Sequence, residues 1–255
     1  MSLEEQFKGR SVLITGAGKG IGRALAIRLG NTYGATVYAL SRTQEDLDAL
    51  KEECPHVKPV CVNLLDWNAT REALQGLDPV DCLINNAAIG GMQPFLEITS
   101  DAFDEVIGTN LKAAVNVSQV ICKKMIDAGN GGSIVNVTSI AGKRSLANYS
   151  VFCTSKAGLD MLTKTMAVEL GQHKIRVNSV SLGCVWTPAF EKFVNLFGGP
   201  ANLDAILASV KARTPLGDPI LPMDDVVNTI LFVLSNASSM MTGENVIVDG
   251  GFCAT

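Results

Sequence analysis

The stretch Thr15-Gly-Ala-Gly-Lys-Gly-Ile-Gly22 joins a short apolar run to the start of an amphipathic one. Glycines in such a turn allow positive φ angles and let the backbone approach a pyrophosphate closely. The helix that follows offers free N–H groups and the positive end of its dipole to phosphate. Because the glycines stand between a strand pattern and a helix pattern, the stretch predicts a dinucleotide-binding turn rather than an ordinary tight turn.

The same alternation of strand and helix patterns continues to the end of the chain without a linker. Most of the strand patterns are nearly continuous apolar runs, which is typical of parallel strands covered on both faces. We therefore predict one domain over residues 1–255, a doubly wound Rossmann fold with a mostly parallel seven-stranded sheet and helices on both faces. The predicted strands are residues 11–15, 36–41, 58–62, 82–85, 133–137, 176–181 and 245–248, and the predicted helices are 21–29, 45–53, 68–74, 101–128, 151–170 and 225–234.

Residues 187–219 contain no strand pattern but carry Phe190, Phe193, Leu196 and Phe197. Ligands of open α/β sheets bind outside the carboxyl ends of the strands, and a mobile segment often closes over them. We interpret this region as a substrate loop or lid. The alternative is a pair of helices that fills the edge of the sheet.

Composition narrows the class of function. The chain has 255 residues, of which 47% are hydrophobic and 18% charged, so a large core is expected and disorder is not. A net charge of −4 gives no reason to expect nucleic acid or an anionic membrane as a partner. No window has the length and apolarity of a transmembrane helix, and the polar start MSLEEQFKGR lacks the apolar core of a secretory signal.

Cysteine and histidine usage indicates a reducing compartment and no metal site. The seven cysteines include no CxxC pair, so we expect free thiols and a cytoplasmic location. His56 and His173 are the only histidines, too few to suggest a metal site or a histidine-based triad.

The end of the second predicted strand carries a signal for cofactor choice. An NAD-binding site places Asp or Glu there for the ribose 2′-hydroxyl, whereas this chain has Ser41 and Arg42. Arg42 offers a planar cation to a 2′-phosphate, and Lys19 in the glycine turn offers a second. We predict NADP(H) as the cofactor. The alternative for Arg42 is a solvated arginine at a strand end.

Further motifs make the whole chain resemble the short-chain dehydrogenase/reductase family. The spacing TGxxxGxG, Asn85-Asn86-Ala87-Ala88, Asn110 within TNL, Ser139 at the end of IVNVTS, Lys156 at the lysine of YxxxK, and Val248-Asp249-Gly250-Gly251 all match family motifs. Stretches such as SRTQEDLDAL and NNAAIGGMQPFLEIT are similar to the L-xylulose (dicarbonyl) reductases within it. Ala88 replaces a glycine, Asn63 stands where an aspartate is frequent, and Ser181-Leu182-Gly183 replaces an N/SPG sequence.

The resemblance implies a role for each matching residue. Lys156 holds the nicotinamide ribose and lowers the pKa of a tyrosine, Ser139 hydrogen-bonds the substrate oxygen, and Asn110 supports a proton-relaying water. Asn110, Ser139, Lys156 and the residue at position 152 form the catalytic set. The implied cofactor residues are Gly16, Lys19, Gly20, Ile21, Gly22, Ser41, Arg42, Asn63, Leu64, Asn86, Ala87, Lys156, Val185 and Thr187, and the implied substrate residues are Ser139, Leu146, Tyr149 and Trp186.

One departure affects the mechanism directly. The family tyrosine that gives a proton to the carbonyl oxygen stands four residues before the lysine, and this chain has Phe152 there. Tyr149 lies seven residues before Lys156 and therefore faces the same side of a helix, but roughly 10 Å away along the axis. A direct acid role for Tyr149 is thus less favoured than lining the substrate pocket, and an ordinary packing role is the third alternative.

Three interpretations of function remain open. The first is an NADPH-dependent reductase of small sugars or α-dicarbonyls, strongly impaired by Phe152. The second is a catalytically silent NADP(H)-binding protein that acts by binding or oligomerising. The third is a deliberately inactivated form of the first, with an engineered Tyr-to-Phe change in an otherwise intact reductase. The presence of Asn110, Ser139 and Lys156 favours an enzyme scaffold, and the resemblance implies a homotetramer formed by the two long helices and the C-terminal segments.

Overall fold

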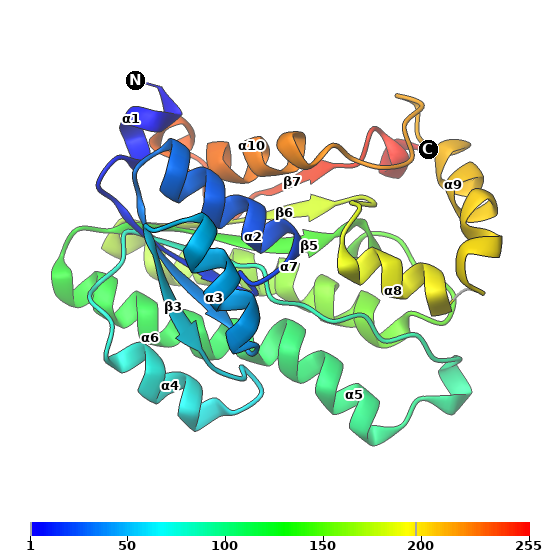
Figure 1. Cartoon of the computed structure of the whole chain (residues 1–255), viewed down its shortest axis with the longest axis horizontal. Helices are drawn as coiled ribbons and strands as arrows, with labels where there is room; N and C mark the ends of the chain where they lie inside the picture. The colour runs from blue at the N-terminus through cyan, green and yellow to red at the C-terminus, as the bar shows by residue number, and fades with distance from the viewer. Residues whose placement is uncertain (1, 197) are drawn as a thin grey trace.

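Seven parallel strands form one sheet in the spatial order β3-β2-β1-β4-β5-β6-β7 (Figure 1). The computed structural model describes residues 2–196 and 198–255. Every neighbouring pair runs parallel, so the sheet is parallel throughout and not only mostly so. The strands are β1 (Ser11–Thr15), β2 (Thr36–Ser41), β3 (Val57–Cys61), β4 (Cys82–Asn85), β5 (Gly132–Ser139), β6 (Ile175–Leu182) and β7 (Asn245–Val248).

Helices cover both faces of this sheet, as the sequence predicts (Figure 1). One face carries α1 (Leu3–Phe7), α2 (Gly20–Ile27), α3 (Gln44–Glu53) and α10 (Met223–Leu234). The other carries α4 (Trp67–Gln75), α5 (Ser100–Ile107), α6 (Ala113–Ala128) and α7 (Ser150–Leu170). Two further helices, α8 (Pro188–Leu196) and α9 (Leu203–Lys211), follow β6 at the carboxyl end of the sheet.

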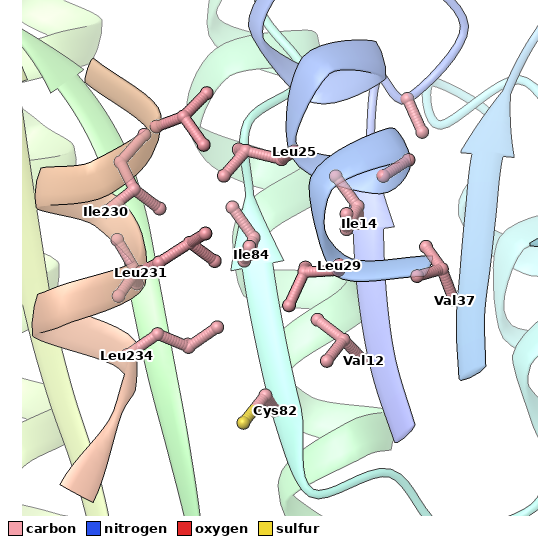
Figure 2. Packing of buried hydrophobic residues seen from close by; sticks show 14 of the residues in the cluster. Val12, Ile14, Leu25, Leu29, Val37, Cys82, Ile84, Ile230, Leu231 and Leu234 are labelled. Atoms are coloured by element: carbon pink, nitrogen blue, oxygen red, sulfur yellow. The ribbon is translucent and has the colours of Figure 1, made fainter. Parts of the chain in front are cut away.

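The core explains why most of the strands are nearly continuous apolar runs. Figure 2 shows side chains of α2 and α10 meeting those of β1 and β4 between sheet and helices. Leu25, Ile14, Ile84 and Leu231 are all fully buried there. A second buried cluster lies on the opposite face, beneath α4, α6 and α7. Because each central strand is covered on both faces, polar alternation along it would bury unpaired polar groups.

The strand order reverses at β1, and this reversal determines where a ligand fits. The chain crosses from β1 to β2 and β3 on one side, then returns to β4 on the other. The two crossovers diverge and leave a crevice outside the carboxyl ends of β1 and β4, the usual binding position in such sheets. Thr15 ends β1 and Asn85 ends β4, so both predicted cofactor motifs begin at this reversal.

Two of the predicted helices are interrupted. The helix predicted over residues 101–128 is α5, a π-helical turn over Gly108–Lys112, and then α6. The helix predicted over 21–29 ends as α2 at Ile27 and continues as a π-helical turn over Arg28–Thr32. A π-helical turn inserts one residue into the i to i−4 pattern, and apolar spacing alone does not reveal so short an insertion. The third strand also lies one residue earlier than predicted.

The described residues of 187–219, which are 187–196 and 198–219, contain no strand, as predicted, and include α8 and α9. A single parallel bridge between Val185 and Leu221 closes the base of this segment. Phe190 and Phe193 of α8 belong to the described residues, while Phe197 lies outside them. The segment therefore returns to the sheet at the position where it left, and its helices stand over the carboxyl ends of the strands.

Within residues 2–196 and 198–255, no single helix is long and apolar enough to cross a membrane. One pair of consecutive helical segments, Pro188–Leu196 and Gly199–Lys211, has the length and apolar composition of a membrane span when taken together. The two segments are bent by 85° relative to each other.

We expect the core between α10 and the sheet to dominate stability. Leu231→Ala should lower the free energy of unfolding by about 2–5 kcal/mol, because it removes a fully buried side chain and leaves a cavity. The matched control is Leu96→Ala, since Leu96 is 94% exposed and should change stability by less than about 0.5 kcal/mol. Urea unfolding of both variants measures the difference, and equal losses would contradict this assignment of the core.

Candidate active site

The glycine turn after β1 is built for close backbone contact. Gly16 has a φ of +67°, and a Cβ there would lie 2.9 Å from the Cα of Ala87. A Cβ on Gly22 would collide with the carbonyl oxygen of Gly16. The N-terminus of α2 carries no side-chain cap, so its first N–H groups remain available to an anion. Larger residues at Gly16 and Gly22 would therefore push apart the backbone of the β1 turn and its neighbour after β4.

Thr15 fastens the β1 turn to the β4 turn. Its hydroxyl oxygen accepts hydrogen bonds from the backbone N–H groups of Asn86 and Ala87, both at 3.0 Å. The Asn86 amide donates back to the carbonyl oxygens of Thr15 and Gly16, at 3.0 and 3.3 Å. The structure thus brings together Gly16, Gly22, Asn86 and Ala87 as the sequence predicts. Thr15 was not among the predicted site residues, although it begins the TGxxxGxG motif.

The expected 2′-phosphate corner contains a carboxylate that the sequence analysis did not weigh. The Lys19 ammonium lies 3.3 Å from Asp46 Oδ2, near the start of α3. Gly18 lies close to both Ser41 and Asp46, because a Cβ on it would be 2.8 Å from Ser41 Oγ and 2.9 Å from Asp46 Cβ. Lys19 is therefore already paired rather than free. Arg42 is exposed and has no ion pair among the described residues.

The remaining predicted cofactor residues are spread around the same crevice. The Asn63 side chain accepts a hydrogen bond from the Leu65 N–H at 3.2 Å and so stabilises its own turn. Leu64 lines a small pocket behind the site together with Thr15 and Asn110. Across the crevice, Thr187 lies over the glycine turn, since a Cβ on Gly20 would be 3.3 Å from its methyl carbon. Val185 is buried at the base of the α8 segment, and Ile21 packs against the core on α2.

Lys156 is a buried cation on α7. Its ammonium donates a hydrogen bond to the carbonyl oxygen of Val137 at 2.9 Å, two residues before Ser139. Burial lowers the pKa of Lys156 to about 8, and the nearby charge of Asp160 acts in the opposite direction. A lysine so placed is held close to the strand end that carries Ser139, and it changes charge near physiological pH.

Phe152 lies one turn before Lys156, with its ring centroid 5.8 Å from the lysine Nζ. The ring therefore occupies the place expected of the family tyrosine but has no proton to give. Tyr149 packs edge-on against Phe152, with centroids 5.3 Å apart, and a Cβ on Gly90 would lie 2.9 Å from its hydroxyl oxygen. Burial raises the pKa of Tyr149 to about 12, which makes it a weaker acid.

Ser139 and Asn110 approach α7 from two sides. The Ser139 hydroxyl accepts a hydrogen bond from the Ala141 N–H at 3.2 Å and so caps the short helical turn Ile140–Gly142. The Asn110 amide, in the π-helical turn, donates to Ser155 Oγ at 3.0 Å and to the Ile89 carbonyl oxygen at 2.9 Å. Asn110 thus ties the segment after β4 to the residue next to Lys156. Ser155 was not among the predicted residues.

An aromatic row connects α7 to α8. Centroids lie 5.4 Å apart for Tyr149 and Phe193, 5.9 Å for Phe193 and Phe190, and 5.5 Å for Phe190 and Trp186. Trp186 is 46% exposed, and its indole N–H donates to Glu191 at 3.2 Å. Leu146, also predicted to line the substrate site, lies on the exposed loop before α7. These ring contacts pack α8 against the start of α7.

Metal ligands do not gather anywhere in the described part of the chain, where no group of three His, Cys, Asp or Glu side chains could hold an ion. The seven cysteines are free, and three of them are buried.

Comparison with known proteins agrees with this geometry. A family model described as "short chain dehydrogenase" matches residues 10–195. The L-xylulose reductase of Mus musculus is 51% identical over 97% of this chain and 98% of its own length. The carbonyl reductase (NADPH) 2 of Sus scrofa is 43% identical over 99% and 100%. A candidate NAD(P)-dependent gluconate 5-dehydrogenase from Beutenbergia cavernae, solved with bound NADP, has a TM-score of 0.86 at 30% identity over 98% and 100%. The chain therefore belongs to the short-chain dehydrogenase family of oxidoreductases.

Proposed function

We propose that this protein is an NADP(H)-dependent reductase of small sugars and α-dicarbonyls whose turnover is strongly reduced by Phe152. The glycine turn supports binding of a dinucleotide, because it leads into the N-terminus of α2, whose first N–H groups have no side-chain cap and are available to a pyrophosphate. The exposed guanidinium of Arg42 supports a 2′-phosphate over a free hydroxyl. The names of the mouse and pig relatives support a sugar or small carbonyl compound as substrate.

Each residue of the site has a chemical task in this proposal. The bound nicotinamide supplies the hydride. Lys156 holds the ribose through its ammonium group, while Ser139 donates a hydrogen bond to the carbonyl oxygen of the substrate. Tyr149 and Trp186, joined by the aromatic row, shield that oxygen from water, which strengthens the hydrogen bond. Val185 and Thr187 flank the nicotinamide, with Thr187 fixing the start of α8 over the glycine turn.

The missing step is proton delivery. As hydride reaches the carbon, negative charge develops on the oxygen, and a positioned acid neutralises it in the transition state. Phe152 leaves this to Ser139 and to a water next to Lys156. Loss of a positioned acid typically costs about 10²–10⁴-fold in rate, or roughly 3–5.5 kcal/mol.

The same observation favours a second candidate function. A protein that only binds NADP(H), and acts through binding or oligomerisation, needs the glycine turn, Arg42 and Lys156 but no acid. In that case Ser139 has no reaction to serve. The comparison of Phe152 with tyrosine therefore separates the two candidates.

We expect Phe152→Tyr to raise kcat for L-xylulose or diacetyl by about 10²–10⁴-fold with little change in NADPH affinity. The restored hydroxyl acts mainly as charge develops, so cofactor binding should be insensitive to it. NADPH oxidation measured for both proteins checks this, with Tyr149→Phe as the control that alters KM alone. A fast unmodified protein that Tyr149→Phe silences would place the acid at Tyr149 instead.

Cofactor preference should depend on Arg42. We expect Arg42→Met to weaken NADPH binding about ten- to a hundredfold while NADH binding stays unchanged, because one charge-assisted contact to the phosphate is lost. Fluorescence titration of both cofactors measures the ratio. Arg28→Met is the matched control. Arg28 forms an ion pair at 2.7 Å with Asp224, a residue of α10, so its replacement should leave the binding of both cofactors unchanged. Tighter binding of NADH than of NADPH by the unmodified protein would refute the NADP(H) proposal.

We also propose a cytoplasmic homotetramer. Seven free cysteines suit a reducing compartment. On α7, Met161 and Val168 are exposed and seven residues apart, so they lie on the same face of the helix, with Lys164 and Thr165 between them.

Val168→Asp should therefore shift the protein to smaller species in sedimentation, because it places a charge in the buried interface. Met240→Asp, at an exposed position outside this face, is the control. A monomeric unmodified protein at micromolar concentration would contradict the tetramer.

A further inference from the structure

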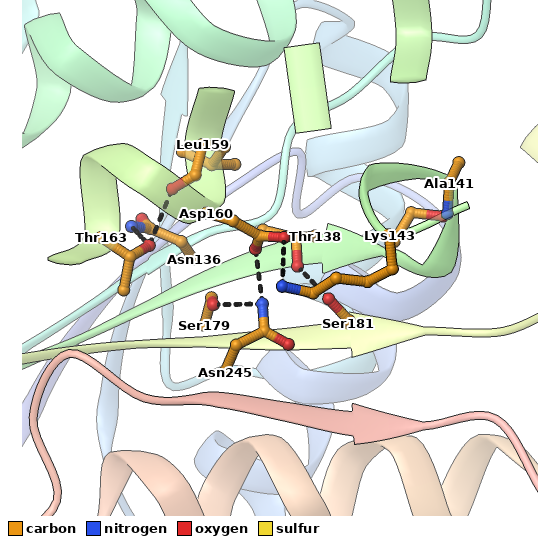
Figure 3. Close-up of polar contacts among 11 residues, drawn as sticks. Asn136, Thr138, Ala141, Lys143, Leu159, Asp160, Thr163, Ser179, Ser181 and Asn245 are labelled. Carbon is orange, nitrogen blue, oxygen red and sulfur yellow. Dashed lines mark hydrogen bonds and ion pairs between the residues drawn. The ribbon is translucent and has the colours of Figure 1, made fainter. Parts of the chain in front are cut away.

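A carboxylate sits behind the proposed site, one helical turn after Lys156. The Asp160 side chain is only 8% exposed, and its Oδ2 lies 3.1 Å from the Lys143 ammonium. Its Oδ1 accepts a hydrogen bond from the Asn245 amide of β7 (Figure 3). Asn245 also donates to Ser179 Oγ on β6 at 2.7 Å. Three separate parts of the chain, α7, the loop after β5 and β7, thus meet at one buried charge, and β6 is joined to it through Asn245.

The loop that carries Lys143 begins at Ser139 and is seated directly on α7. A Cβ on Gly142 would lie 3.0 Å from the carbonyl carbon of Lys156 and 3.0 Å from the N of Ala157. Only glycine permits this approach without displacing the loop. The loop therefore contacts α7 at two adjacent points, through the backbone at Gly142 and Lys156 and through the side chains of Lys143 and Asp160.

The segment around Ser139 is consequently bound to α7 on both sides. Before Ser139, the Val137 carbonyl oxygen accepts the hydrogen bond of Lys156. After Ser139, Lys143 pairs with Asp160. We propose that Lys143 and Asp160 are positioning residues that fix Ser139 against Lys156 and control the charge of Lys156 through the shared carboxylate.

The charges around Lys156 support the second part of this proposal. On its own helix the charge that acts on Lys156 is Asp160, and Lys143 pairs with that carboxylate from the loop after β5. The strand residue bonded to Asp160 is the neutral Asn245, which also donates to Ser179. Asp160 favours the protonated form of Lys156 and opposes the effect of burial on its pKa. Lys143 neutralises part of that carboxylate, so the two residues act on Lys156 with opposite sign.

The contact differs from an ordinary surface ion pair. Asp160 Oδ2 accepts no aligned hydrogen bond from any described residue and lies 3.1 Å from the Lys143 ammonium, while Lys156 stands one helical turn earlier on α7. Lys123 and Asp127 on α6 are also 3.1 Å apart, but both side chains are mostly exposed. Such exposed pairs are screened by solvent. The Lys123–Asp127 pair, with the same N–O distance, is therefore a control for the buried pair.

The decisive experiment measures the titration of Lys156 in the cofactor-free protein. In lysine-labelled protein, the side-chain NMR signal that disappears in Lys156→Arg belongs to Lys156. Asp160→Asn keeps the shape and the acceptor for Asn245, and should lower the midpoint by about one pH unit. Lys143→Gln should raise it, and Lys143→Arg should restore the original midpoint. Lys123→Gln should leave it unchanged.

NADPH titration gives a second measurement, because this inference rests on the proposed cofactor binding. Affinity should fall as pH rises through the Lys156 midpoint, and this fall should move with that midpoint in each variant. Failure to bind NADPH would overturn the proposed function but leave the NMR test standing. Shifts of the same sign in Asp160→Asn and Lys143→Gln, or no shift in either, would overturn the inference. If Asp160→Asn fails to fold, an unchanged midpoint in Lys143→Gln overturns it equally.

Discussion

The site depends on the contact between the turns that follow β1 and β4. Thr15 binds two backbone N–H groups of the β4 turn, and Asn86 binds two carbonyl oxygens of the β1 turn. This exchange satisfies polar groups that would otherwise be stranded at the ends of two buried strands. It also fixes Gly16 against Ala87 with no room for a Cβ. Cofactor binding and strand pairing therefore rely on the same few atoms.

Much of this arrangement follows from the sequence, because its causes are local. Apolar runs covered on both faces identify the strands, and four strand ranges match the structure residue for residue. The glycine motif has a specific steric cause, as the collision at Gly22 demonstrates. The π-helical turn around Asn110 was missed because a single inserted residue leaves little trace in apolar spacing. Pairings across long separations, such as Lys19 with Asp46 or Lys143 with Asp160, depend on how helices meet and have no local pattern.

In the proposed reaction, Phe152 keeps an aromatic ring at this position but no acidic hydroxyl. Its ring contacts Tyr149 and lies 5.8 Å from the Lys156 Nζ. What differs from a site with tyrosine is the group on which the charge of Lys156 acts. A buried ammonium next to a phenol stabilises the phenolate, but next to a benzene ring it has only cofactor, water and backbone as partners. The intact surroundings of Lys156 suggest a site in which cofactor binding and proton transfer are separable.

Asn245 has a further consequence that concerns the order in which the protein is made. Asp160 and Asn245 are 85 residues apart in the chain. At about 5–20 residues per second, roughly 4–17 s pass during synthesis between the two. During this interval α7 and its carboxylate have no β7 amide beside them, and β6 lacks its outer neighbour. Vectorial synthesis thus leaves β6 as the edge of the sheet, and Asp160 without its β7 partner, for several seconds.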